Sequence, residues 1–111
     1  MSTEKGRESE RIAASYLESF GLEILARNYR SRRGEIDIIA RDGIELVFVE
    51  VRRRRILSLA AESIDVFKRR RIGLAALDYM VDRGELSCRF DAILFGAGGE
   101  ICWLRSAFDF E

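Results

Sequence analysis

The stretch that decides the fold of this 111-residue chain is Gly34–Arg55, GEIDIIARDGIELVFVEVRRRR. Residues 35–41 and residues 45–53 are rich in β-branched and aromatic side chains, and a turn signal at Asp42–Gly43 separates them. This pattern predicts a β-hairpin. The second run contains LVFV, which leaves no polar face, so we expect it to be a central strand that is covered on both sides.

The segments around this hairpin predict the other elements of an α/β domain. Apolar residues at helical spacing, followed by glycine, indicate two helices, and short apolar runs indicate three more strands. The predicted helices are residues 4–20 and 63–83, and the predicted strands are 22–30, 89–96 and 101–104. The order αβββαββ places a helix between the third and fourth strands, which permits a parallel crossover. We therefore expect one α/β domain over residues 1–111, built on a central mixed sheet.

Each predicted helix has an apolar stripe that we expect to be buried. The stripe of the first helix consists of Ile12, Ala13, Tyr16, Leu17 and Phe20. The stripe of the second helix consists of Ile64, Phe67, Ile72, Ala75, Ala76 and Tyr79.

Composition excludes several classes of function. The chain has no His and only two Cys, so His-based catalysis and closed zinc sites are ruled out. It has no glycine-rich phosphate-binding motif, no apolar run long enough to span a membrane and no apolar leader segment. We expect a cytoplasmic protein whose chemistry depends on carboxylates, hydroxyls, Arg, Lys and a hard cation.

The hairpin register predicts that two acidic side chains converge. A two-residue loop at Asp42–Gly43 would place Asp37 diagonal to Glu50, and a four-residue loop over residues 42–45 would place the two directly opposite. Both loops put the carboxylates on one face, where a divalent cation with oxygen ligands would compensate their charge. The alternative is that both acids pair with nearby Arg side chains at the strand ends.

Two further residues are predicted to lie near this pair. Arg52 shares a strand face with Glu50, because side chains alternate along a strand. Glu10 precedes Ala13 by three residues, so it lies on or beside the packed side of the first helix and can point towards the acids. The alternative for Glu10 is an ordinary acidic residue in a charged first turn.

The chain is neutral overall, but its basic residues are concentrated in the middle third. Residues 27–71 contain 13 basic and 7 acidic side chains. Most of the basic ones fall in three clusters: Arg27, Arg30, Arg32 and Arg33; Arg52, Arg53, Arg54 and Arg55; Lys68, Arg69, Arg70 and Arg71. Arginine suits bidentate phosphate contacts, so these clusters favour a nucleic-acid partner. A solvated basic face without a partner is the alternative.

Several of these segments resemble the YraN family of small bacterial proteins. They are GRESERIAASYL, ILARNYR, GEIDIIARD, LVFVEVRRR and RFDAIL, and the resemblance runs from Gly6 to Phe108. The YraN family is similar to archaeal Holliday junction resolvases of the restriction-endonuclease-like, PD-(D/E)XK, superfamily. The resemblance implies a mixed sheet flanked by helices, a Mg²⁺-type nuclease site, and a homodimer by analogy with resolvases.

The resemblance also implies roles for individual residues. Asp37 and Glu50 would hold Mg²⁺ or Mn²⁺, with the Val51 carbonyl as a third ligand. Glu10 would complete the shell or orient water, and Arg52 falls on the position of the superfamily's Lys. Arginine cannot act as a base, although it can stabilise charge that develops on a phosphate.

Three hypotheses about function follow. The first is a metal-dependent endonuclease that acts on structured or branched DNA. The second is a nucleic-acid-binding protein on a nuclease fold, without turnover. The third is a protein-interaction module whose Arg clusters meet an acidic partner, and it predicts no salt-dependent affinity for DNA. None of the three involves a membrane.

Overall fold

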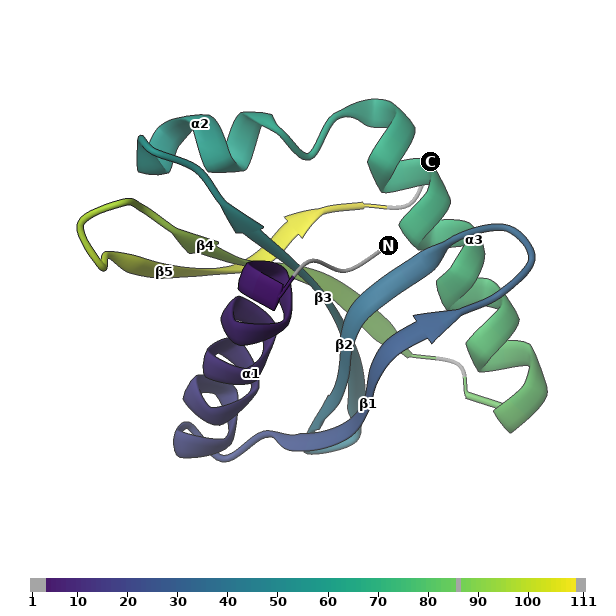
Figure 1. The fold of residues 1–111 in the computed structure, drawn as a ribbon. Coiled ribbons are helices and arrows are strands. Elements are labelled where there is room, and N and C mark those ends of the chain that lie inside the picture. The colour runs from purple at the N-terminus through teal and green to yellow at the C-terminus, as the bar shows by residue number, and fades with distance from the viewer. Residues whose placement is uncertain (1–3, 86, 110–111) are drawn as a thin grey trace.

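The central strand of the sheet is β3 (Glu45–Arg53), which is buried from Leu46 to Glu50 and has a strand on each side. The structure is a computed structural model, and it describes residues 4–85 and 87–109. The other elements are α1 (Glu4–Ser19), β1 (Glu23–Arg30), β2 (Glu35–Asp42), α2 (Leu57–Glu62), α3 (Val66–Arg83), β4 (Cys88–Phe95) and β5 (Ile101–Phe108). The prediction of an α/β fold with a mixed sheet flanked by helices is confirmed (Figure 1).

The five strands follow the chain order β1-β2-β3-β4-β5 across the sheet. All neighbours are antiparallel except β3 and β4, which are parallel because the chain crosses over between them. This crossover contains two helices, so the element order is αβββααββ and the predicted order αβββαββ is wrong. The additional helix α2 has six residues, of which only Ala60 is buried, so no apolar period was visible in it.

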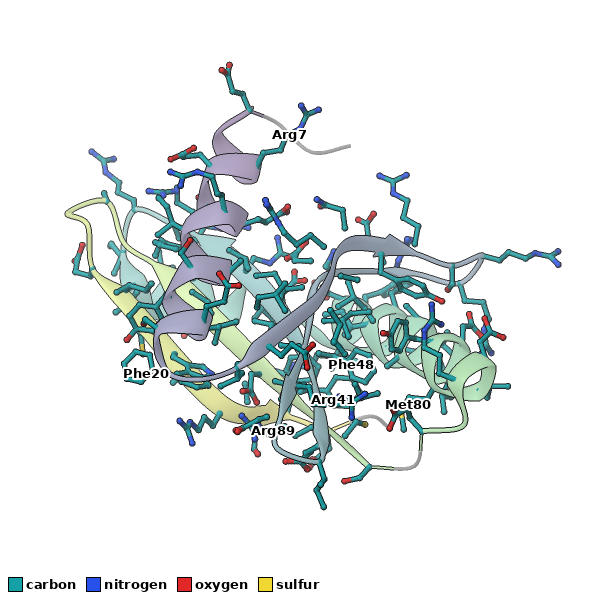
Figure 2. All side chains as sticks on the ribbon, turned by 90° about the horizontal axis from the view of Figure 1, so that it is seen from below. Arg7, Phe20, Arg41, Phe48, Met80 and Arg89 are labelled. Atoms are coloured by element: carbon teal, nitrogen blue, oxygen red, sulfur yellow. The ribbon has the colours of Figure 1, made fainter. Side chains whose placement is uncertain are left out.

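The helices cover opposite faces of the sheet and create two apolar layers. On one face, Ala13 and Leu17 of α1 pack against Val47 and Val49 of β3. On the other face, α2 and α3 pack over a cluster that includes Phe48. Figure 2 shows Phe48 in this interior, whereas Arg7 and Phe20 lie at opposite ends of α1. None of the helices in the described part of the chain is long and apolar enough to cross a membrane.

The hairpin between β2 and β3 has the register that would place Asp37 opposite Glu50 if the pairing continued beyond Ile38 and Val49. Arg41 pairs with Leu46 and Asp42 pairs with Glu45, so the loop consists of Gly43 and Ile44 alone. Gly43 has φ +64°, a conformation that glycine adopts without steric cost. The turn is therefore one residue later than the predicted turn at Asp42–Gly43. The loop still has an even number of residues, so Asp37 and Glu50 remain on the same side of the hairpin.

Two predicted stripes include side chains that are in fact exposed. Phe67 is 79% exposed, Phe20 is 56% exposed and Ile12 is 36% exposed. Phe67 is five residues before Ile72, so at about 100° per residue it projects about 140° away from the buried stripe. Phe20 follows the end of α1 and packs instead against the rings of Tyr16 and Trp103.

A buried carboxylate at the centre of β4 fixes the position of β5. Asp91 is fully buried and accepts hydrogen bonds from Trp103 Nε1 and from Ser106 N, both at 2.9 Å. Arg89 forms an ion pair with it at 3.1 Å. These contacts lie beside a register shift between β4 and β5, and β5 extends to Phe108 rather than ending at Leu104 as predicted.

We predict that Gly34→Ala destabilises the fold. A Cβ at Gly34 would lie 2.0 Å from the carbonyl oxygen of Arg71, so the turn between β1 and β2 would have to move away from α3. Overpacking of this kind costs about 1–3 kcal/mol, which urea denaturation would measure. Gly98→Ala is the matched control, because its Cβ would meet only the flexible end of Glu100. Equal stability of the two variants would contradict the close contact.

Candidate functional site: a cavity where β2 and β3 separate

The candidate site begins where the ladder between β2 and β3 ends. The last assigned pair is Ile38 with Val49, and beyond it the Asp37 side chain takes the place of the backbone partner. Asp37 Oδ2 accepts a hydrogen bond from Val51 N–H at 2.8 Å. A carboxylate is therefore inserted between the two strands at the point where they separate.

The neighbouring strand β1 is irregular at the same level. Arg27 pairs with Ile38 and Tyr29 pairs with Ile36, and Asn28 between them has φ +54°. Ile36 and Ile39 belong to the same apolar cluster, although strict alternation would place them on opposite faces. The alternation of β2 therefore breaks at Asp37, opposite Asn28.

A cavity of about 770 Å³ opens at this break. It is lined by the four predicted catalytic residues and the predicted third ligand, namely Glu10, Asp37, Glu50, Arg52 and Val51. Helix α1 supplies Glu10, β2 supplies Asp37, and β3 supplies the other three. The structure thus gathers in one place the residues that the sequence separates by up to 42 positions.

Glu50 is the most deeply buried acid of the cavity, with 2% of the residue exposed. Its Oε2 forms ion pairs with Arg52 Nε at 3.0 Å and with Lys68 Nζ at 3.8 Å. Its Oε1 is also buried and has no hydrogen-bond partner. The predicted alternative, in which the acid pairs with arginine, therefore describes only one of the two oxygens.

The pKa of the Glu50 carboxyl is raised to about 8, first by burial and then by the nearby charge of Asp37. Lys68 and Arg52 oppose this rise by stabilising the charged form. The pKa of Glu10 is raised for the same reasons, first by burial and then by the charge of Asp37, and a side-chain hydrogen bond from Asn28 lowers it. Glu10 Oε1 is likewise buried without a partner. The cavity therefore brings acidic groups together at an electrostatic cost that a bound cation would relieve.

The three basic clusters are not all at this cavity. The clusters contribute Arg30, Arg52, Arg53, Arg54, Arg55 and Lys68 to its lining, but not Arg27, Arg32, Arg33, Arg69, Arg70 or Arg71. Arg33 forms an ion pair with Asp78 on α3 at 2.6 Å, and Arg69 Nε donates to the Ile64 carbonyl at 2.8 Å. The cluster at the end of β3 thus lines the cavity, whereas each of the other two contributes only one residue to it.

Lys68 lines the cavity, unlike the other three residues of its basic cluster. The sequence predicts Lys68 as a phosphate contact together with Arg69, Arg70 and Arg71, yet its ammonium group lies 3.8 Å from both Glu35 and Glu50. The sequence spacing indicates this inward position, because Lys68 is four residues before the buried Ile72 and shares its side of α3. Asn28 was also missed, although asparagine is enriched among residues with positive φ.

The donor set of the cavity fits a hard divalent cation held by few protein ligands. Within residues 4–85 and 87–109, no group of three or more His, Cys, Asp or Glu side chains could hold a metal ion. Magnesium is commonly bound by one or two carboxylates, with waters and substrate phosphates completing the shell. Asp37 and Glu50 supply such a pair, and the unpartnered Glu50 Oε1 is a buried oxygen available to a ligand.

These features define an α/β protein in which the buried Glu50 lies beside Asp37 in a cavity bordered by arginine. Residues 9–95 match the Uncharacterised protein family UPF0102, and the chain belongs to this family. The expected membership in the YraN family, which is the same family, is thereby confirmed.

Bacterial relatives match almost the whole chain. A UPF0102 protein of Dechloromonas aromatica is 48% identical over 108 residues, which cover 96% of this chain and 89% of the relative. One of Nitrosospira multiformis is 47% identical over 110 residues, covering 95% and 92%. One of Legionella pneumophila is 40% identical over 115 residues, covering 98% of each. The family match over residues 9–95 spans the positions of Glu10, Asp37, Glu50 and Arg52.

We predict that Glu50→Gln flattens the dependence of stability on pH. The folded-state pKa of about 8 lies above the ordinary value of 4.5, so between these values the folded protein keeps a proton that the unfolded chain releases. Stability therefore falls as pH rises through this window, by at most about 1.4 kcal/mol per pH unit for one proton. Urea denaturation from pH 5 to pH 9 would measure the slope in both proteins.

Glu8→Gln is the control, because Glu8 is exposed and Arg11 lowers its pKa, so its titration lies below this window. It should leave the slope above pH 5 unchanged. The same slope in Glu50→Gln as in the wild type would show that Glu50 does not titrate in this range.

Proposed function

We propose that the protein is a metal-dependent endonuclease that binds nucleic acid at this cavity and hydrolyses phosphodiester bonds in structured or branched DNA. The observation that carries the proposal is the buried Glu50 carboxylate, which lies beside Asp37 and keeps one oxygen unpartnered. The likeness of the motif Asp37, Glu50 and Arg52 to that of the restriction-endonuclease-like superfamily supports it. The mixed sheet flanked by helices is compatible with that fold.

Asp37 and Glu50 would hold Mg²⁺ or Mn²⁺, with the Val51 carbonyl as a third ligand. Such an ion lowers the pKa of water and neutralises charge on a phosphate. Asp37 is already oriented by the Val51 N–H, so it enters this role with a fixed position. Glu10, which approaches from α1, would orient the attacking water through its own unpartnered oxygen.

Arg52 and the residues after it would contact the nucleic acid. The Arg52 side chain lies over Glu50 and faces the cavity, where a guanidinium group can stabilise charge on a phosphate in the transition state. Arg54 and Arg55 are exposed at the border of the cavity and would follow the backbone of the substrate. Arg53 is more constrained, because it donates to Ser9 Oγ at 2.8 Å and stacks over Phe95.

The ion pair between Arg52 and Glu50 favours a second candidate, which is binding of nucleic acid without turnover. Arg52 and Lys68 already neutralise one oxygen of Glu50, so the acid is partly compensated without a metal. In that case the cavity would serve as a phosphate-binding site only. The two candidates differ in their dependence on a divalent ion and in the effect of changing Arg52.

We predict that Arg52→Ala abolishes cleavage, because the loss of one preorganised donor lowers a rate by about 10²–10³-fold. Arg52→Lys should retain activity or raise it, since it restores the residue that the superfamily has at this position. The measurement is single-turnover cleavage of a four-way DNA junction with Mn²⁺, and Arg105→Ala on β5 is the control variant that should cleave like the wild type.

Cleavage by Arg52→Ala at the wild-type rate would contradict the role of Arg52. An absence of cleavage by wild type, with junction binding intact, would rule out the nuclease and favour the binding protein.

A further inference from the structure

A second, smaller groove adjoins the cavity on the side of α3. Its volume is about 380 Å³, and it shares Glu35, Arg52 and Lys68 with the cavity. Phe67 and Arg71 on α3, with Ser63 and Asp65 just before this helix, complete the lining of the groove. The two hollows therefore adjoin along the side chains that they share.

The groove combines an exposed aromatic ring with three basic side chains. Phe67 is 79% exposed, although it is among the largest apolar residues of the chain, and it belongs to the first turn of α3. Arg52, Lys68 and Arg71 lie in the same groove. Lys68 is held against Glu35 and Glu50, whereas Arg71 is exposed. This arrangement offers a flat apolar surface within reach of positive charge.

A nucleotide has the complementary chemistry, because its base presents a flat π-face and its phosphate is an anion. Proteins that bind single strands use aromatic side chains as stacking platforms beside a basic groove. Phe67 is exposed, and the first turn of α3 places it among the charged side chains of the groove. The charge around the ring makes the groove unlike an apolar surface that packs against a second copy of the chain.

We infer that the groove of Phe67, Lys68 and Arg71 binds one unpaired nucleotide next to the phosphate that lies in the cavity. The base stacks on the Phe67 ring, and its phosphate lies between Arg71 and Arg52. This inference rests on the proposed function and specifies its substrate class. In a continuous duplex each base is already stacked on both faces, and releasing it costs a few kcal/mol. The preferred substrate is therefore a duplex with an unpaired nucleotide at a fork, flap or branch.

The test compares the affinities for two DNA molecules, measured by fluorescence anisotropy in EDTA so that no cleavage occurs. One is a forked duplex with unpaired nucleotides, and the other is a fully paired duplex of the same length. Phe67→Ala should weaken binding of the fork about 5- to 150-fold, as expected for the loss of one base–aromatic stack, and leave binding of the full duplex unchanged. Phe67→Trp should retain the preference for the fork.

Val66→Ala is the matched control, because Val66 is the adjacent residue and is 72% exposed but does not line the groove. It should bind both substrates like the wild type. Equal effects of Phe67→Ala on fork and duplex, or no effect on either, would overturn the inference. So would a wild-type dimer, seen by sedimentation, that both Phe67→Ala and Val66→Ala dissociate, since the exposed apolar surface would then be a contact between copies.

The failure of this inference can be distinguished from failure of the proposed function. If wild type cleaves junction DNA with Mn²⁺ while Phe67→Ala shows no selective loss for the fork, only the inference about the groove is wrong. If wild type binds neither DNA at low salt, the proposed function is wrong, and the inference about the groove is wrong with it.

Discussion

Asp37 Oδ2 accepts the Val51 N–H at 2.8 Å where β2 and β3 separate, and the rest of the site depends on this hydrogen bond. The carboxylate replaces the backbone carbonyl that would otherwise accept this hydrogen bond. The Val51 N–H of β3 therefore keeps a hydrogen-bond partner at the point where β2 separates from β3. The same contact brings a negative charge to the buried Glu50, which raises the pKa of Glu50. Removal of this side chain would therefore alter the separation of the strands as well as the charge of the cavity.

The acids and bases of the cavity form one unit rather than a set of independent residues. Glu50 is buried among Asp37, Arg52 and Lys68, and each neighbour changes the free energy of its charged form. Replacements within such a group do not add, because removing one cation leaves a buried anion with less compensation. The cost of this arrangement falls on the stability of the fold, as is usual where function requires polar groups at a buried position.

The sequence predicts the central features of the fold because they depend on local patterns. The hairpin from β2 to β3 follows from two β-rich runs around Gly43, and the end of α3 follows from Gly84, which is in the left-handed conformation. The convergence of Asp37 and Glu50 follows from an even loop. These features need only the periodicity of the strands and the chemistry of glycine, so one sequence is sufficient to reveal them.

Other features depend on contacts between distant segments and were not predictable in the same way. The break of alternation at Asp37 involves Asn28 on another strand, and α2 is too short to show a period. The exposure of Phe67 and the inward position of Lys68 depend on how α3 lies against the sheet. The helical spacing of both residues from Ile72 nevertheless indicates which side of α3 each one occupies. The three basic clusters do not all line the cavity, and Arg33 pairs with Asp78 on α3 instead.

Titration calorimetry with Mn²⁺ tests whether Asp37 and Glu50 together bind a divalent cation. Asp37→Asn keeps a carbonyl oxygen that can accept the Val51 N–H but removes the charge, so the fold should persist while the ligand is lost. Asp78→Asn, at the exposed ion pair with Arg33, is the control. The account predicts that wild type and Asp78→Asn bind Mn²⁺ and that Asp37→Asn does not. The same binding of Mn²⁺ by Asp37→Asn and wild type would contradict it.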